Sequence, residues 1–140
     1  MNPVTRAVIW VLLLSGCAAT PHRTAETGEA ELALLIGDRT PGTPVHCINM
    51  RHVRSSRIVA RTAIVYQISR SLFYVNRPLS GAEALATDTV LLSRTSTGNL
   101  CDGNIVHLLD SDLNQQGAVA LSTFVPYRAT APAPVSKPGS

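Results

Sequence analysis

The sequence predicts a small, mainly β (α+β) domain with one helix at its N-terminal end and a mostly antiparallel sheet that curls or forms a partial barrel. Three observations support this fold class. From residue 45 onward, short apolar runs rich in Val, Ile and Tyr alternate with turn-forming segments. The preceding segment, 26–36, has helical spacing and end signals. The chain has 140 residues, 45% of them hydrophobic, which suits one packed domain and excludes a wholly disordered chain.

The first expected element is a helix over residues 26–36. Thr27 can cap its N-terminus, and Glu29 and Glu31 place negative charge in its first turns. Gly37 follows the last apolar residue and can adopt the left-handed backbone that ends many helices. These signals give the helix a defined start and end.

The strands follow a proline-rich turn at 39–44 and are expected at 62–68, 72–75, 89–93, 105–109 and 118–125. Ile64, Tyr66 and Ile68 recur at every second position and should therefore share one face. The first two of these strands should form a hairpin through 69–71, and 82–86 is expected to form one helical turn. Strand order does not follow from the sequence.

The N-terminal residues resemble a lipoprotein leader. An uncharged apolar run of eight residues, 7–14, is too short to span a bilayer but long enough for a signal peptide. It ends in Leu14-Ser15-Gly16-Cys17, which resembles the lipobox of bacterial lipoproteins. That resemblance implies cleavage of residues 1–16 and attachment of lipid to Cys17. The alternative is an ordinary secretory signal in which Cys17 is incidental.

The leader sets the expected organisation and location. Residues 17–25 should be a tether, 26–128 a single globular domain, and 129–140 a disordered tail with three prolines. The membrane is then a partner through the lipid on Cys17, and the domain faces the periplasm in the cell envelope. Ala18 stands where an Asp would retain the protein in the inner membrane, which favours the outer membrane.

Two cysteines remain once Cys17 is assigned to lipid, namely Cys47 and Cys101. Export places them in an oxidising compartment, where a disulfide is the expected state. His46 is next to Cys47, but adjacent residues on a strand point to opposite faces, so His46 would be a poor base for a Cys47 nucleophile.

The densest basic stretch contains four arginines: Arg51, Arg54, Arg57 and Arg61. One interpretation is contact with an anionic envelope component, such as the phosphates of lipid headgroups, lipopolysaccharide or a cell-wall polymer. The other, which we favour, is a solvated loop or an edge strand protected by charge. Export, a net charge of only +3 and the absence of interleaved aromatic residues argue against nucleic acid.

No familiar catalytic or cofactor motif is present, and we expect no metal and no cofactor. The histidines match no usual zinc spacing, and His107 is expected to be half-buried and hydrogen-bonded within an apolar strand. Asp110-Ser111-Asp112-Leu113-Asn114 opens like a calcium loop, but Gln115 replaces the turn glycine, which favours an Asx-rich loop between strands.

Several segments of the mature chain together resemble a family of small proteobacterial lipoproteins of unknown function. Besides the lipobox, these are 39–44 leading to Cys47, 61–66, 74–78, Leu100-Cys101 and 124–127. The resemblance implies an exported domain with paired cysteines and no particular activity. We therefore expect a non-enzymatic binding or structural module that contacts an envelope component or another envelope protein. The alternative is a hydrolase-type enzyme that acts on an envelope substrate, with the loop at 110–114 as its site.

Overall fold

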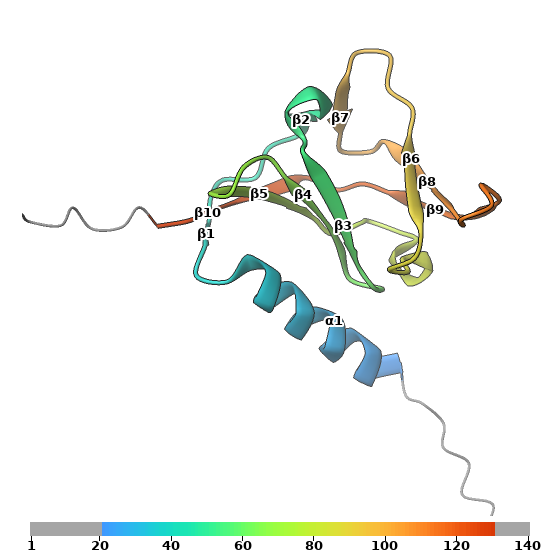
Figure 1. Cartoon of the computed structure of the whole chain (residues 1–140), viewed down its shortest axis with the longest axis horizontal. Helices are drawn as coiled ribbons and strands as arrows, with labels where there is room; N and C mark the ends of the chain where they lie inside the picture. The colour runs from blue at the N-terminus through green and yellow to red at the C-terminus, as the bar shows by residue number, and fades with distance from the viewer. Residues whose placement is uncertain (1–20, 131–140) are drawn as a thin grey trace, which may run out of the picture.

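The computed structural model describes residues 21–130. Its largest sheet has five strands, all paired antiparallel (Figure 1). In spatial order they are β1 (Thr40–Pro41), β10 (Phe124–Arg128), β5 (Leu72–Asn76), β4 (Ala63–Gln67) and β3 (Ser55–Val59). The hairpin expected around residues 69–71 is confirmed, because β4 pairs with β5. The sheets are mainly antiparallel and do not close into a barrel.

Helix α1 (Pro21–Ile36) covers one face of this sheet (Figure 1). Leu32 and Ile36 are buried against a small apolar cluster that includes Val59, Val65 and Val75. The helix ends where the sequence predicted, because Gly37 has a φ of 62° and its N–H donates to the carbonyl of Ala33 at 2.9 Å.

The start of the helix differs from the sequence prediction. Helix α1 begins at Pro21, so residues 21–25, expected as part of the tether, are helical. Proline is well suited to the first turn of a helix, where its missing N–H would have no partner in any case. Residues 17–20 of the expected tether and 131–140 of the expected tail lie outside the described residues.

The opposite face of the large sheet packs against two smaller antiparallel sheets. One contains β6 (Val90–Ser93), β8 (Ile105–Leu109) and β9 (Gln115–Ala120), and the other pairs β2 (Cys47–Asn49) with β7 (Asn99–Cys101). Residues from all three sheets form the main core, among them Ile64, Leu100, Leu108 and Phe124. The large sheet therefore lies between a helix and a second β layer.

Strand β4 is consequently buried on both faces. Ala63 and Val65 face α1, while Ile64 and Tyr66 face the second layer. There the ring of Tyr66 packs edge-on against the ring of Phe124, with 5.8 Å between the ring centroids. Ile68, predicted to continue this face, lies beyond the end of the strand.

The strand predicted at 118–125 is wrong as one element. Strand β9 ends at Ala120 and β10 begins at Phe124, and the two belong to different sheets. The fully buried Asn76 fixes the crossing between them, because its amide group donates to the carbonyl of Ser122 at 2.6 Å and accepts from the Ser122 N–H at 3.3 Å. The break between β9 and β10 involves a residue that is distant in the sequence, so no local sequence pattern indicates it.

Two short 3-10 helices complete the described part of the chain. Helix η1 (Met50–His52) precedes β3, and η2 (Ala82–Ala84) matches the helical turn expected near 82–86. Gly81 precedes η2 with a φ of 80° and packs so tightly that an added Cβ would lie 2.2 Å from a carbonyl oxygen of β9. Within residues 21–130, no helix has the length and hydropathy needed to cross a membrane.

Candidate binding groove at an open sheet edge

Strand β3 lies at an edge of the five-stranded sheet. Within the described part of the chain it is paired only with β4, from Ser55 opposite Gln67 to Val59 opposite Ala63. In an antiparallel sheet, alternate residues of an edge strand direct their N–H and C=O groups away from the neighbouring strand. The outer side of β3 therefore presents backbone groups that a further strand could bind.

The other edge of the same sheet has far fewer backbone groups that a further strand could bind. Strand β1 has only two residues, one of which is Pro41 and has no N–H to donate. Short strands and prolines are common devices that prevent unwanted pairing at a sheet edge. The two edges therefore differ in their capacity to accept a strand.

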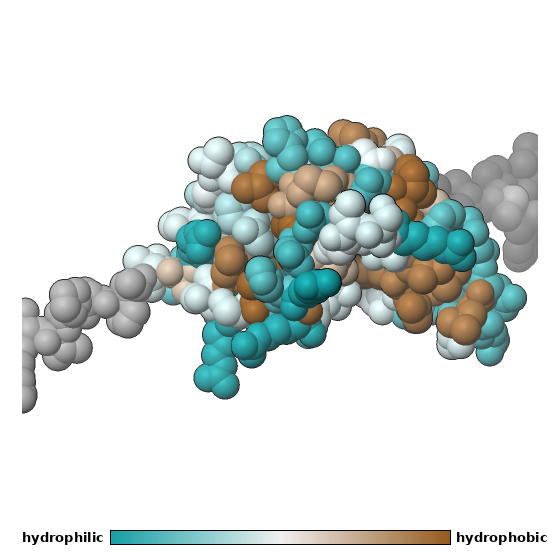
Figure 2. Space-filling model, turned by 90° about the horizontal axis from the view of Figure 1, so that it is seen from above, coloured by the Kyte–Doolittle hydropathy of each residue, from teal (hydrophilic) through white to brown (hydrophobic). Residues whose placement is uncertain are grey.

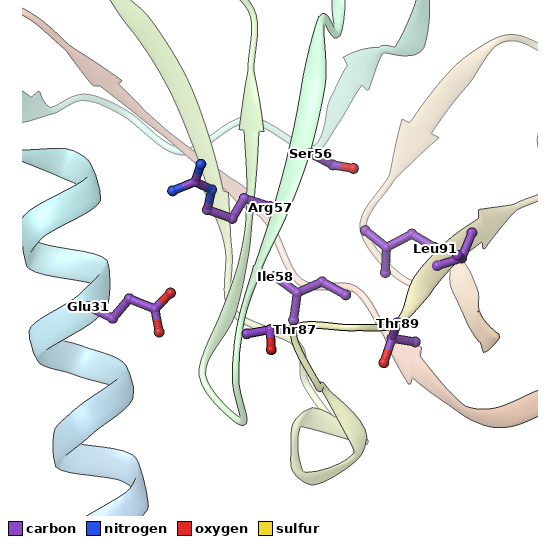
Figure 3. A pocket seen from close by; sticks show the side chains of 8 residues that line it. Glu31, Ser56, Arg57, Ile58, Thr87, Thr89 and Leu91 are labelled. Carbon is purple, nitrogen blue, oxygen red and sulfur yellow. The ribbon is translucent and has the colours of Figure 1, made fainter. Parts of the chain in front are cut away.

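A hollow of about 510 Å³ borders the β3 edge, between β3, β6 and α1 (Figure 3). In Figure 3, Arg57 extends from β3 toward α1, whereas Ile58 points toward β6 and Leu91 points back from β6. Glu31 projects from α1 toward the same hollow. The lining residues are Glu31, Ser56, Arg57, Ile58, Thr87, Thr89, Val90 and Leu91.

A second hollow of about 320 Å³ lies between the first half of β3 and the C-terminal part of α1. It shares Ser56 and Arg57 with the first hollow. Its other lining residues are Leu34, Leu35, Ser55, Val65, Gln67 and Phe73. We call the β3 edge together with these two hollows the β3 groove.

The four arginines identified in the sequence follow this edge. Arg51 lies in η1, Arg54 directly precedes β3, Arg57 lies within it, and Arg61 lies in the turn that leads to β4, with a φ of 55°. All four are exposed, and none forms an ion pair within residues 26–130. Residues 55–59 of this segment thus form an edge strand, which is one of the two forms that the favoured interpretation allowed, while Arg51, Arg54 and Arg61 lie outside the strand itself.

The disulfide between Cys47 and Cys101 is confirmed. The two cysteines lie directly opposite each other on β2 and β7, and the next pair along these strands is Ile48 opposite Leu100. Both of these neighbours are buried in the main core, so the bridge joins two strands that are also held by packing.

An interaction beside the disulfide was not predicted from the sequence. His46 Nδ1 lies 2.8 Å from an oxygen of the Asp102 carboxylate, and the Asp102 N–H donates to the His46 carbonyl at 2.8 Å. The expected disulfide could have indicated this contact, because two bonded cysteines bring the residues next to them, here His46 and Asp102, close together. The His46 side chain is 79% exposed and that of Asp102 is 37% exposed, so the pair lies at the surface.

The loop at 110–114 is an Asx-rich turn between β8 and β9. Oδ1 of Asp110 accepts hydrogen bonds from the N–H groups of Asp112 and Asn114, each at 2.9 Å, and Oδ2 accepts one from Gln116 at 2.7 Å. These bonds, that from the Asn114 N–H foremost, lower the pKa of Asp110. The carboxylate therefore serves the loop's own conformation.

A charged pair connects α1 to the segment after β5. Both oxygens of the Glu29 carboxylate accept hydrogen bonds from the Arg77 guanidinium, one of them at 2.9 Å. The side-chain hydrogen bond to Arg77 is the main cause of the lowered pKa of Glu29. The partners are 48 residues apart, so no local pattern could have indicated the pair.

The outer side of the three-stranded sheet is rich in apolar residues. Val90, Ile105 and Leu113 are 47–69% exposed there, and Figure 2 shows hydrophobic residues gathered at the end of the molecule that contains β6, β8 and β9. His107 is half-buried on this sheet, as expected. The prediction that His107 is hydrogen-bonded is wrong for its Nδ1 atom, which is buried and has no hydrogen-bond partner within the described residues.

No three residues among His, Cys, Asp and Glu in the described part of the chain lie close enough together to hold a metal ion. Cys17, the expected site of lipid attachment, lies outside the described residues. No protein-family model, curated protein or solved structure matches this chain.

Proposed function

We propose that this protein is a lipid-anchored module of the cell envelope that binds a partner at the β3 groove and does not catalyse a reaction. The observation that carries the proposal is the open edge of β3 with two hollows beside it. An exposed sheet edge lined by apolar and hydroxyl groups is typical of binding surfaces.

The side chains around the groove favour binding over catalysis. The first hollow contains one carboxylate, Glu31, one guanidinium, Arg57, and otherwise hydroxyl or apolar side chains. None of these forms the adjacent nucleophile and base that covalent catalysis requires. The alternative hydrolase would use the loop at 110–114, but both oxygens of Asp110 accept hydrogen bonds from neighbouring residues, namely Asp112, Asn114 and Gln116.

The proposed anchor would hold the groove close to a membrane. Three residues, 18–20, separate Cys17 from the first residue of α1. An extended chain spans at most about 3.5 Å per residue, so the lipid would keep the start of the helix within about 14 Å of its attachment point. The groove borders Glu31 and Leu34, which lie about 15–20 Å further along the helix at about 1.5 Å per residue. A partner at the β3 groove would therefore lie within about 35 Å of the attachment point, in the same membrane or in the envelope layer next to it.

Site-specific photo-crosslinking in intact cells tests the proposal. A photoreactive residue replaces Ser56 in the groove of the full-length protein, and a matched variant carries it at the exposed Asp112 in the β8–β9 loop. We expect one discrete adduct from position 56 and none from position 112. The absence of any adduct at position 56, or the same adducts from both positions, would contradict binding at the groove.

A further inference from the structure

We propose that the β3 groove binds an extended, acidic polypeptide segment that adds to the sheet as a sixth strand next to β3. This inference rests on the proposed function and specifies the partner. It combines the open backbone of β3, the two hollows that border this strand and the charge along the edge.

The backbone provides the first argument. Strand β3 spans Ser55–Val59 and pairs with β4 along its whole length, which leaves its outer side open within residues 21–130. Addition of a peptide to a sheet edge gains affinity from main-chain hydrogen bonds of this kind. The opposite edge, β1, is too short and contains Pro41, so β3 is the edge at which addition is expected.

The hollows provide the second argument. Successive side chains of a strand point to opposite faces of its sheet, so an added strand needs space on both faces. On the α1 face, the second hollow contains Phe73 and Leu34, whose side chain is 85% exposed. On the other face, Ile58 and Leu91 line the first hollow. Apolar side chains of the added strand would occupy these spaces.

Charge complementarity provides the third argument and defines the occupant. Arg54 and Arg57 are exposed at the start and middle of the edge, and neither has an ion-pair partner in the described part of the chain. Acidic side chains on the added strand would meet them. The carboxylate of Glu31 lines the first hollow together with Ile58 and Thr87, so the acidic positions should lie toward Arg54.

The same charges argue against this chain's own segments as the occupant. Residues 1–20 and 131–140 contain no Asp or Glu and carry Arg6 and Lys137, respectively. A second copy of β3 would bring two sets of arginines together, and like charges across an edge destabilise the pairing. The occupant is therefore a different polypeptide.

Peptide binding to the mature, lipidated protein in nanodiscs of neutral lipid tests the inference. The probe is a short fluorescent peptide in which pairs of valines alternate with pairs of glutamates, so that both faces of the added strand carry both residue types. Its binding is followed by fluorescence anisotropy. One control peptide replaces glutamate by lysine, and two others carry N-methyl groups on either alternate set of residues, which removes half of the backbone N–H donors. Hydrogen exchange of the β3 amides reports where the peptide binds.

We expect saturable binding of the valine–glutamate peptide, slower exchange of the β3 amides, and loss of binding when the N-methyl groups occupy the set of residues that faces β3. The double variant Arg54→Gln/Arg57→Gln should weaken binding about three- to tenfold at low salt, because two exposed charge pairs are lost. The matched variant Arg94→Gln/Arg128→Gln removes two exposed arginines that do not line the groove, one after β6 and the other on β10, and it should bind like the wild type.

Several results would overturn the inference. These are no binding of the valine–glutamate peptide, equal binding of the lysine peptide, or equal binding of both N-methylated peptides. Preferential, Arg54- and Arg57-dependent binding to vesicles that contain anionic lipid would assign the edge to headgroups instead. If crosslinking at position 56 succeeds while these peptide results are negative, the groove binds a partner of another kind. If crosslinking also fails, the proposed function fails as well.

Discussion

Removal of the Cys47–Cys101 disulfide should lower the free energy of unfolding by about 4 kcal/mol. The bridge joins residues 54 apart in the sequence. In the chain-entropy model, closing a loop of this length removes about 14 cal/mol/K from the unfolded chain, which is about 4 kcal/mol at about 25 °C. This is a large part of the stability of a small domain, which is typically about 5–15 kcal/mol.

The domain should nevertheless fold without the bridge. Ile48 and Leu100, the neighbouring pair on β2 and β7, are 4% and 1% exposed, and they remain packed in the main core when the sulfur atoms are lost. Their burial is retained in the double variant Cys47→Ser/Cys101→Ser. The loss should therefore appear as a lower unfolding midpoint of an otherwise native domain.

Urea unfolding followed by far-ultraviolet circular dichroism measures this loss, since the single tryptophan, Trp10, lies in the expected leader. With a slope of about 2 kcal/mol per M, the midpoint should fall by about 2 M. Each single Cys→Ser variant and the reduced wild type should match the double variant, because each simply opens the same loop. Unchanged midpoints in the double variant and in the reduced wild type would refute the reasoning.

Three further predictions concern other parts of the chain. Gly81→Ala should destabilise the domain well beyond the roughly 1 kcal/mol expected for a left-handed backbone, because its Cβ would collide with β9. Gly98→Ala, at a φ of 74° in open space, should lose only that roughly 1 kcal/mol. Urea unfolding of the two variants measures the difference. The Arg77 hydrogen bond lowers the pKa of Glu29 below its ordinary 4.5, so the pair stabilises the domain above that pH and its contribution is lost as the pH falls through the lowered pKa. Glu29→Gln should accordingly lose less stability than the wild type between about pH 5 and about pH 3, and equal losses would dismiss the pair as a source of acid sensitivity. Cys17→Ala should abolish incorporation of labelled fatty acid into the protein, whereas continued incorporation would place the lipid elsewhere.

The elements that the sequence predicted best are those with strong local signals. Gly37 ends α1 as expected, and the strand at 105–109 has the predicted bounds, because turn-forming residues flank this apolar run and its Val106 and Leu108 face the core. Strands β1, β2 and β7 have only two or three residues each, which is too short for periodicity to reveal. The break between β9 and β10 depends on Asn76, a residue more than forty positions away from Ser122.

The candidate site shows the same division. The sequence predicted the arginine-rich segment and left open whether it is a solvated loop or an edge strand, because residue composition alone indicates the charge but not the pairing. It could not predict that β3 faces β6 and α1 across two hollows, since these contacts join segments distant in the chain. Nor could it locate the Glu29–Arg77 pair, whose partners meet only when α1 packs on the sheet.

By itself, the sequence determined the β-rich fold class, the helix end, the charged segment and the expectation that Cys47 and Cys101 pair. These properties depend on periodicity, composition and compartment, which are local or global features of the chain. Only the tertiary structure decided which strand lies at an open edge and what borders it. The physical reason is that strand order and groove shape arise from packing between distant residues, and the sequence of each strand is compatible with many neighbours.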